Sequence, residues 1–198
     1  MEGKYFVKGK DEEKDKHEHV IFTFSDDVTL RYHDTRKFGR MKLVPKDKIT
    51  EIEELNKHGI EPIDKKLNKE YVYEKIHSKN IAIKTVLLDQ TIISGLGNIY
   101  ADEVLFDAGI NPLRKASTIT VDEANKIVKA CNKIIKKAIS EGGTTIRSYT
   151  SSLGVTGRFQ QFLMVHKRET EKCYKCGTLI KKEKVNGRST YYCSKCQH

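Results

Sequence analysis

The chain has 198 residues and carries 37 Lys or Arg against 27 Asp or Glu, a formal net charge of +10. It is 37% hydrophobic and 32% charged, a globular balance that disfavours wholesale disorder. The positive surplus favours a polyanionic partner, either nucleic acid or an anionic membrane face. The membrane class is disfavoured, because no apolar run approaches the roughly 20 residues that cross a bilayer. No signal peptide opens the sequence, so we expect a cytoplasmic protein in which disulfides are rare.

The positive charge is concentrated near the C-terminus. Residues 158–198 hold ten Lys or Arg and three Glu, so about a fifth of the chain carries most of the surplus. A solvated lysine-rich surface explains this clustering as well as a nucleic-acid interface does. Charge alone therefore does not decide between the two.

The first sixty residues favour strands. Residues 20–24 and 28–32 are rich in β-branched and aromatic side chains, and the Ser-Asp-Asp segment between them has turn composition. A further strand is predicted over residues 40–44, and residues 10–19 are expected to form a polar loop. Because so few strands leave the sheet with open edges and one uncovered face, we expect a partial sheet domain over residues 1–62.

The hydrophobic period becomes helical further along the chain. Asn98 stands where an N-cap would begin a helix, and Gly109 is a suitable residue to end it. Thr120 and Glu123 form a capping box before a long amphipathic helix, whose apolar stripe contains Cys131. We interpret Cys131 as a packed core residue. The helices are predicted over residues 67–77, 81–88, 99–108 and from 121 to the glycine pair at 142–143.

Two Cys-x-x-Cys pairs lie in the last thirty residues, sixteen residues apart, and consist of Cys173, Cys176, Cys193 and Cys196. This spacing predicts one structural Zn²⁺ held by four thiolates. A redox Cys-x-x-Cys is the alternative, but the duplicated pair without a βαβ pattern disfavours it. Between the pairs, Asn186-Gly187 is a strong hairpin turn signal. Arg188 follows directly, where it is either a solvated turn residue or a phosphate ligand.

A glycine-rich loop supplies a second candidate for anion binding. Gly95-Leu96-Gly97-Asn98 opens a helix, so free backbone N–H groups and the positive end of the helix dipole would face a phosphate. An ordinary helix cap is the simpler interpretation of such a loop. Lys84, about one helix earlier, is a third candidate that would lie near the same phosphates.

Several motifs in order resemble one family. They are Gly95-Leu-Gly-Asn-Ile-Tyr-Ala-Asp-Glu103, Ala108-Gly-Ile-Asn-Pro112, Gly142-Gly-Thr-Thr-Ile-Arg147 and the four-cysteine finger. Together with Tyr32-His-Asp-Thr-Arg-Lys-Phe-Gly-Arg-Met41 they resemble formamidopyrimidine-DNA glycosylase. The resemblance implies an α+β fold: a partial β-sandwich remnant over residues 1–62 and a helix-two-turn-helix DNA-binding domain over 63–142. A lesion-capping loop and linker over 143–168 and a zinc β-hairpin finger over 169–198 would follow.

The resemblance implies a bacterial, nucleoid-associated protein that excises oxidised purines from double-stranded DNA, with no membrane and no small-molecule cofactor. The damaged base would be flipped out of the duplex. Arg36 would face the orphaned cytosine, and Phe38 would be the apolar wedge. The implied DNA contacts are Met1, Arg36, Phe38, Lys84, Gly97, Asn98 and Arg188. The implied lesion loop contains Thr144, Thr145, Arg147 and Tyr149.

The family's nucleophile is the amine of an N-terminal proline, assisted by a glutamate and a lysine. The three prolines here, Pro45, Pro62 and Pro112, are internal. We therefore expect a chain that lacks the N-terminal catalytic part and carries no catalytic residue. Three interpretations stay open: part of a glycosylase, a natural non-catalytic zinc-dependent DNA-binding protein, or a zinc-ribbon protein-interaction module.

Overall fold

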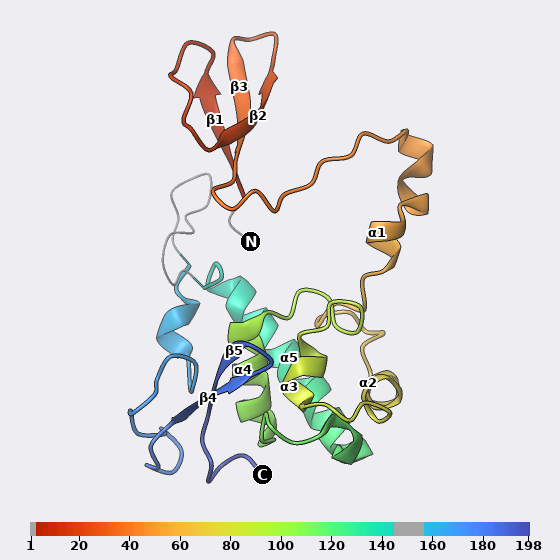
Figure 1. Ribbon diagram of the computed structural model, residues 1–198, viewed down its shortest axis with the longest axis vertical. Helices are drawn as coiled ribbons and strands as arrows, with labels where there is room; N and C mark the ends of the chain where they lie inside the picture. The colour runs from red at the N-terminus through yellow and green to blue at the C-terminus, as the bar shows by residue number, and fades with distance from the viewer. Residues whose placement is uncertain (1–2, 145–156) are drawn as a thin grey trace. The chain divides into compact units, whose positions relative to one another are not determined.

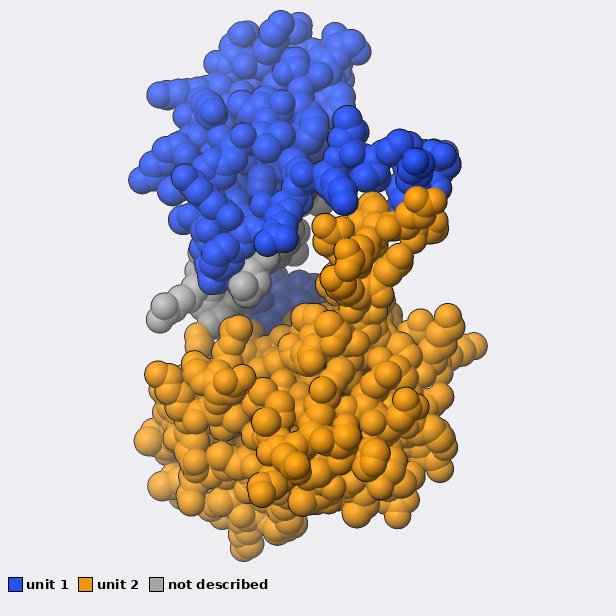
Figure 2. Space-filling view, turned by 45° about the vertical axis from the view of Figure 1, so that its right-hand side comes forward, with its two compact units in different colours: residues 1–49, 141–160 blue, residues 50–140, 161–198 orange. Residues whose placement is uncertain are grey.

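The computed structural model describes residues 3–144 and 157–198, and the chain divides into two compact units (Figures 1 and 2). The sheet unit comprises Met1–Ile49 and Glu141–Gln160. The helix–zinc unit comprises Thr50–Ser140 and Gln161–His198. Small sheets and a helical bundle together confirm the mixed α and β fold class. The zinc finger belongs to the same compact unit as the helices, so packing does not separate these two predicted domains.

The sheet unit contains three antiparallel strands in the order β1-β3-β2. They are β1 (Lys4–Gly9), β2 (Glu18–Thr23) and β3 (Val28–His33). The expected strands over 20–24 and 28–32 are confirmed as β2 and β3. The expected strand over 40–44 is wrong, because none of the described strands pairs with this segment.

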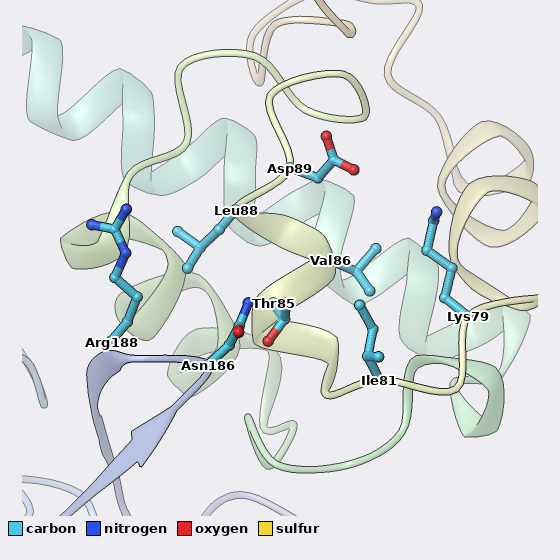
Figure 3. A pocket seen from close by; sticks show the side chains of 8 residues that line it. All are labelled: Lys79, Ile81, Thr85, Val86, Leu88, Asp89, Asn186 and Arg188. Atoms are coloured by element: carbon cyan, nitrogen blue, oxygen red, sulfur yellow. The ribbon is translucent and has the colours of Figure 1, made fainter. Parts of the chain in front are cut away.

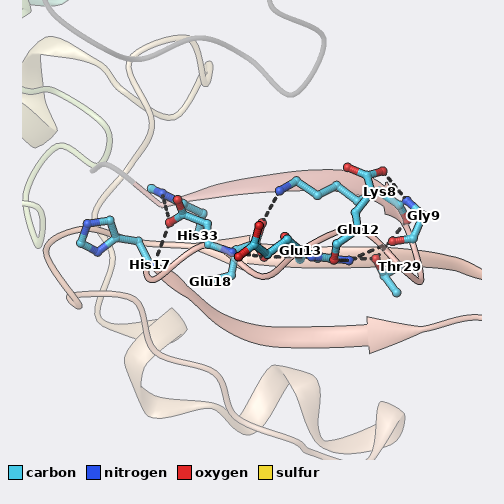
Figure 4. A network of polar contacts seen from close by, with 10 residues as sticks. Lys8, Gly9, Glu12, Glu13, His17, Glu18, Thr29 and His33 are labelled. Atoms are coloured by element: carbon cyan, nitrogen blue, oxygen red, sulfur yellow. Dashed lines mark hydrogen bonds and ion pairs between the residues drawn. The ribbon is translucent and has the colours of Figure 1, made fainter.

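A buried arginine organises the sheet unit. Arg31 is 2% exposed and its guanidinium forms an ion pair with Glu18 at 3.2 Å. Its remaining hydrogen bonds go to Thr29 Oγ1 and to the carbonyls of Gly9, Glu12 and Glu13. Figure 4 shows this network along the strands. The predicted polar loop is therefore tied to β3 by charge-assisted hydrogen bonds rather than by apolar packing.

The apolar side chains of the sheet unit remain accessible. Phe22 is 43% exposed, Phe24 is 51% exposed and Leu43 is fully exposed. The buried apolar clusters of the described residues lie in the helix–zinc unit instead. This agrees with the expectation that so few strands leave one face uncovered.

The rest of the chain is mainly helical. Two short elements follow the sheet, a 3₁₀ turn η1 (Lys46–Glu51) and α1 (Glu53–Asn56). The helix–zinc unit then contains α2 (Lys69–Ile76), α3 (Ile83–Leu87), α4 (Asn98–Ala108), η2 (Ala116–Thr118) and α5 (Val121–Ser140). The last elements are η3 (Phe159–Phe162), β4 (Lys181–Val185) and β5 (Arg188–Tyr192). All four predicted helices are confirmed, with ends moved by two residues or fewer.

Local side chains determine several helix ends. The Thr120–Glu123 capping box is present: the Glu123 amide donates to Thr120 Oγ1, and the Thr120 amide donates to Glu123 Oε2. Gly109 ends α4 with a left-handed φ of 74°, as expected of a glycine there. The N-cap of α4 is Gly97, so the assignment of Asn98 as the cap is wrong. Asn98 is the first helical residue, which frees its side chain for a contact outside the helix.

The main core lies among α2, α4 and α5, where α5 packs against both other helices. Cys131 lies in this core with no exposed surface, which confirms the interpretation of it as a packing residue. Burial raises the pKa of the Cys131 thiol to about 12. No described helix is long and apolar enough to cross a membrane. The core thus forms a rigid support for the loops at its edge.

Candidate zinc centre and nucleic-acid interface

The four predicted zinc ligands converge. The Sγ atoms of Cys173, Cys176, Cys193 and Cys196 all lie within 4.8 Å of one another. Two of the separations are 3.9 Å (Cys173–Cys196) and 3.4 Å (Cys176–Cys193). A tetrahedral Zn²⁺ with bonds of about 2.3 Å needs sulfurs about 3.8 Å apart. The four thiols therefore fit one structural zinc ion, and the prediction of this site is confirmed.

The thiols differ in acidity. Hydrogen bonds from the Thr178 side chain and amide lower the pKa of Cys176 to about 6. Burial raises the pKa of Cys196 to about 12. Because zinc binds thiolates, occupation of the site would release protons from the more basic thiols.

The predicted hairpin between the cysteine pairs is confirmed as β4 and β5. Asn186 and Gly187 form its turn with φ of 45° and 74°. Two successive positive φ values are the backbone of a type I′ turn, which explains the Asn-Gly sequence. Arg188 pairs across the turn with Val185, and its side chain is exposed. The zinc knuckles and the turn together present one arginine at the tip of a short hairpin.

The C-terminal residues join the finger to the end of α4. The Cys193 amide donates to Gln197 Oε1, and Gln197 Nε2 donates to the Ile110 carbonyl, each at 2.9 Å. The His198 amide donates to the Gly109 carbonyl at 3.1 Å. The finger is therefore docked on the helical core by its own last residues.

Two buried acids of α4 also hold the finger, and the sequence-based interpretation missed both. Glu103 accepts hydrogen bonds from the amides of Met164, Val165 and His166 at 2.8–3.0 Å. Burial raises the pKa of Glu103, while these amides oppose that shift. Two adjacent acids in the middle of a mainly apolar helix were the available signal, because such acids are rarely buried without partners.

Asp102 connects three parts of the helix–zinc unit. Its Oδ1 pairs with Lys84 Nζ at 2.7 Å, and its Oδ2 lies 2.7 Å from His166 Nδ1. The Tyr191 amide of β5 also donates to Oδ2, at 3.4 Å. Figure 1 shows β5 beside α4, as these contacts require. Asp102 therefore links α3, α4 and β5 within one buried network.

The structure places Lys84 inside the protein. Its side chain has no exposed surface, and its ammonium donates to the Ser189 carbonyl and to Thr190 Oγ1, each at 2.9 Å. Burial lowers the pKa of Lys84, and the Asp102 carboxylate opposes this shift. Direct contact between Lys84 and a DNA phosphate does not fit this burial, whereas contact with the hairpin is observed.

Asn98 reaches the same carbonyl. Its Nδ2 donates to the Ser189 oxygen at 3.0 Å, and Gly97 before it is exposed at the start of α4. The glycine-rich loop, Lys84 and the hairpin therefore meet at the residue next to Arg188. Of the predicted DNA-binding residues in the helix–zinc unit, Gly97 and Arg188 present exposed surface and Asn98 is partly exposed.

A cavity of about 340 Å³ lies between α3 and the hairpin turn (Figure 3). Its side chains come from α3, from the loops on either side of α3 and from the hairpin turn: Lys79, Ile81, Thr85, Val86, Leu88, Asp89, Asn186 and Arg188. Lys79 and Arg188 are cations that suit a phosphate, whereas the Asp89 carboxylate would repel one.

The predicted base-stack residues of the sheet unit lie on the loop after β3. The Arg36 guanidinium carbon is 4.5 Å from the centre of the Phe38 ring, and Phe38 is 62% exposed. Asp34, which the sequence-based interpretation missed, holds this loop: it accepts from the amides of Arg36 and Gly39 at 3.0 and 2.9 Å. The Gly39 amide and the Tyr32 hydroxyl lower the pKa of Asp34 to about 2.

The predicted lesion loop is described only at its edges. Thr144 is half-buried, whereas Thr145, Arg147 and Tyr149, like Met1, lie outside the described residues. The Arg158 amide donates to the Glu141 carbonyl at 2.8 Å, and the Phe159 amide donates to the Gly143 carbonyl at 3.0 Å. A Cβ on Gly157 would stand 2.2 Å from the Gly143 oxygen. Residues 141–143 and 157–159 therefore lie side by side, and position 157 needs glycine.

Three family models match the chain. The formamidopyrimidine-DNA glycosylase N-terminal domain matches residues 1–41, and the H2TH domain of the same enzyme matches residues 58–150. The zinc finger found in FPG and IleRS matches residues 171–198. The match over residues 1–41 means that the comparisons do not support the expectation of a missing N-terminal part. The expectation that no residue here is catalytic stays a prediction.

Individual relatives are similar to this chain over its whole length. A formamidopyrimidine-DNA glycosylase of Ureaplasma parvum is 44% identical over 199 residues, covering 100% of this chain and 72% of the relative. Two Lactococcus lactis Fpg structures, a mutant with Fapy-dG containing DNA and a complex with abasic site containing DNA, superpose with TM-scores of 0.90 and 0.89. Their identities are 38% and 39%, covering 100% of this chain and 72% of each structure. The chain belongs to the formamidopyrimidine-DNA glycosylase family.

Proposed function

We propose that this protein binds damaged duplex DNA and serves the repair of oxidised purines, as a zinc-containing DNA glycosylase of its family. The observation that carries the proposal is the meeting of the Gly97–Asn98 helix start with the Arg188 hairpin on one Ser189 carbonyl. Two anion-binding elements are thereby held side by side on a rigid core. The solved relatives bound to lesion-containing DNA support the same conclusion.

The roles within the proposed interface follow from exposure and chemistry. Arg188 and the Gly97–Asn98 backbone bind phosphates next to the lesion, because Arg188 and Gly97 are exposed and Asn98 is partly exposed. Arg36 and Phe38 enter the space left by a flipped base, since a cation stacked on an exposed ring suits a gap in the base stack. The protein then acts on DNA in the bacterial cytoplasm, at the nucleoid.

The test is a binding titration with the zinc-loaded protein. Fluorescence anisotropy would compare a duplex containing a stable abasic-site analogue with the same duplex undamaged, across a series of salt concentrations. We expect tighter binding to the lesion duplex and a linear fall of log K with log salt. Equal affinity for both duplexes, or an affinity that salt does not change, would contradict the proposal.

Arg188→Ala sharpens the test. This variant should keep its zinc, weaken binding by about tenfold or more and reduce the salt slope by about 0.9, the value for one lost phosphate contact. Lys133→Ala is the matched control, because Lys133 is an exposed cation of the same unit that pairs with Asp107 on the helices. If Lys133→Ala weakened binding as much as Arg188→Ala, the effect would reflect net charge rather than the hairpin.

A second candidate is a zinc-dependent DNA-binding protein without catalysis. It is favoured by the burial of Lys84, whose amine is bonded within the protein and is the one side-chain amine among the described residues assigned to the interface. Borohydride trapping on a true abasic-site duplex separates the two candidates. Efficient trapping at one site would establish lyase chemistry, whereas tight lesion binding without trapping would favour the non-catalytic protein.

A further inference from the structure

We propose that Lys84 is a positioning residue: its buried ammonium holds the Ser189 carbonyl and so fixes Arg188 in place for a phosphate. The inference rests on the proposed function. It replaces the expectation that Lys84 itself lies against the nucleotide. Asp102 is a second positioning residue, because its Oδ1 forms an ion pair with the ammonium at 2.7 Å.

The Lys84 ammonium is occupied by contacts within the protein. A lysine ammonium has three N–H donors and no acceptor. Three acceptors lie within 2.9 Å of Nζ: Asp102 Oδ1, the Ser189 carbonyl and Thr190 Oγ1. Nζ therefore forms two hydrogen bonds with the hairpin and an ion pair with Asp102, and its side chain has no exposed surface for a phosphate. A fully buried ammonium held in this way acts through its partners.

The two hairpin partners of Lys84 lie next to Arg188 in the chain. Ser189 and Thr190 directly follow Arg188 in β5, on the strand that leaves the hairpin turn. Two side chains from the helical core, Lys84 and Asn98, donate to the same Ser189 oxygen at 2.9 and 3.0 Å. The backbone beside Arg188 is thus fixed to the loop that begins α4. Zinc stiffens the finger. The contacts of Lys84 and Asn98 with the Ser189 carbonyl, here called the hairpin joint, set the direction in which the hairpin points.

Asn98 is compatible with both roles. Its side-chain amide has two N–H donors, and one of them reaches the Ser189 carbonyl. The second donor is available for a phosphate that Arg188 also contacts. The hairpin joint would therefore bring two phosphate-binding side chains, Asn98 and Arg188, together, whereas zinc alone constrains only the hairpin.

The experiment is a double-mutant cycle on the full zinc-loaded chain, with Lys84→Met, Arg188→Ala and the variant carrying both. The measurements are zinc content, affinity for the abasic-analogue duplex and the salt slope. We expect Lys84→Met to retain zinc, weaken binding by about tenfold and lower the slope by about 0.9, as Arg188→Ala does. The combined variant should bind within about twofold of Arg188→Ala, because both changes remove one contact.

Two outcomes overturn the proposal. If Lys84 touched a phosphate itself, the two losses would multiply and the slope would fall by about 1.8 in the combined variant. If Lys84→Met bound the duplex like the wild type, the hairpin joint would have no effect on phosphate binding by Arg188. Failure of the wild type to prefer the lesion duplex would instead sink the proposed function, so the two failures are distinguishable.

A second variant covers the case in which Lys84→Met alone loses zinc. Lys84→Met combined with Asp102→Asn removes both charges, so no buried charge is left unpaired, and the asparagine oxygen can still accept from His166. We expect this variant to keep zinc and to show the same weakened binding and lower slope. Wild-type binding by this variant would overturn the proposal. Loss of zinc here too would mean that Lys84 supports the metal site, which would also overturn it.

Discussion

The two loops that carry the predicted DNA contacts are held in different ways. Arg188 stands on a hairpin fixed by four zinc-ligating cysteines, by Lys84 and by the docked C-terminus. Among the described contacts, the loop of Arg36 and Phe38 is held mainly through Asp34, whose carboxylate accepts from two loop amides and whose backbone bonds to His17 and His19. Many independent anchors make a stiff element, whereas one anchor leaves a loop that can adjust. We therefore expect the proposed phosphate contact of Arg188 to be formed in advance and the proposed base-stack contact of Arg36 and Phe38 to adjust on binding.

The interiors of the two units also differ, in the kind of interaction that stabilises each. The helix–zinc unit has a continuous apolar core, in which α5 packs against α2 and α4. The sheet unit is centred on the Arg31–Glu18 ion pair and leaves Phe22 and Phe24 exposed. Apolar burial gives stability without regard to direction, whereas a buried ion pair depends on every partner. The sheet unit should therefore be the more easily broken of the two.

The largest expected effect is that of Cys193→Ser. Loss of one thiolate removes a ligand of a structural zinc, whose binding energy is part of the folding energy of such fingers. We expect zinc content to fall from one ion per chain toward zero and lesion binding to drop by more than about a hundredfold, since several contacts depend on the finger. Metal analysis by mass spectrometry and anisotropy would measure both.

Cys131→Ser is the matched control, because Cys131 is the buried cysteine of α5 outside the zinc site. Placing an unpaired hydroxyl in the core should cost about 1–3 kcal/mol of unfolding free energy while zinc and DNA binding persist. Retention of both by Cys193→Ser, or their loss in Cys131→Ser, would contradict the assignment of the metal site.

Arg31→Met is expected to have the next largest effect. It removes the guanidinium from the buried Glu18, which keeps the Lys8 ammonium at 2.7 Å. Leaving a buried charge wholly unpaired costs about 3–5 kcal/mol, so we expect a smaller loss here. A three-stranded sheet has little stability to lose, so amide exchange should become fast across the sheet while the helix–zinc unit stays protected. Arg40→Met, at an exposed position of the same unit, should leave exchange unchanged. Equal loss of protection in both units would show that they unfold as one.

The smallest effect concerns the pH dependence of the Asp34 loop. Because the folded pKa is lowered from 3.8 to about 2, the carboxylate stabilises the loop fully above about pH 4 and this contribution is lost as pH falls toward 2. In an NMR titration, the amides of Arg36 and Gly39 should shift with a midpoint near pH 2. A midpoint at the ordinary value of 3.8 would mean that Asp34 does not hold these amides in solution.

Periodic and turn-forming patterns were predictable from the sequence. The four helices, the capping box at Thr120 and the Asn186-Gly187 hairpin follow from local chemistry, and so does the zinc site, because its ligands lie in two short pairs. The strand expected at residues 40–44 failed because β-propensity reports a fit to neighbouring strands. None of the described strands pairs with that segment.

The sequence by itself determined the family and the metal site, since these depend on short motifs, whereas the residues that face DNA stay a prediction. The tertiary structure decided what Lys84, Asp102 and Glu103 do. Lys84 and Asp102 pair with each other across 18 positions (102 − 84), and their other partners and those of Glu103 lie 61 to 106 positions away. No local pattern encodes such pairings. A lysine that local chemistry assigns to a phosphate is buried by the fold against a backbone carbonyl, because an ammonium in the interior must have each donor satisfied.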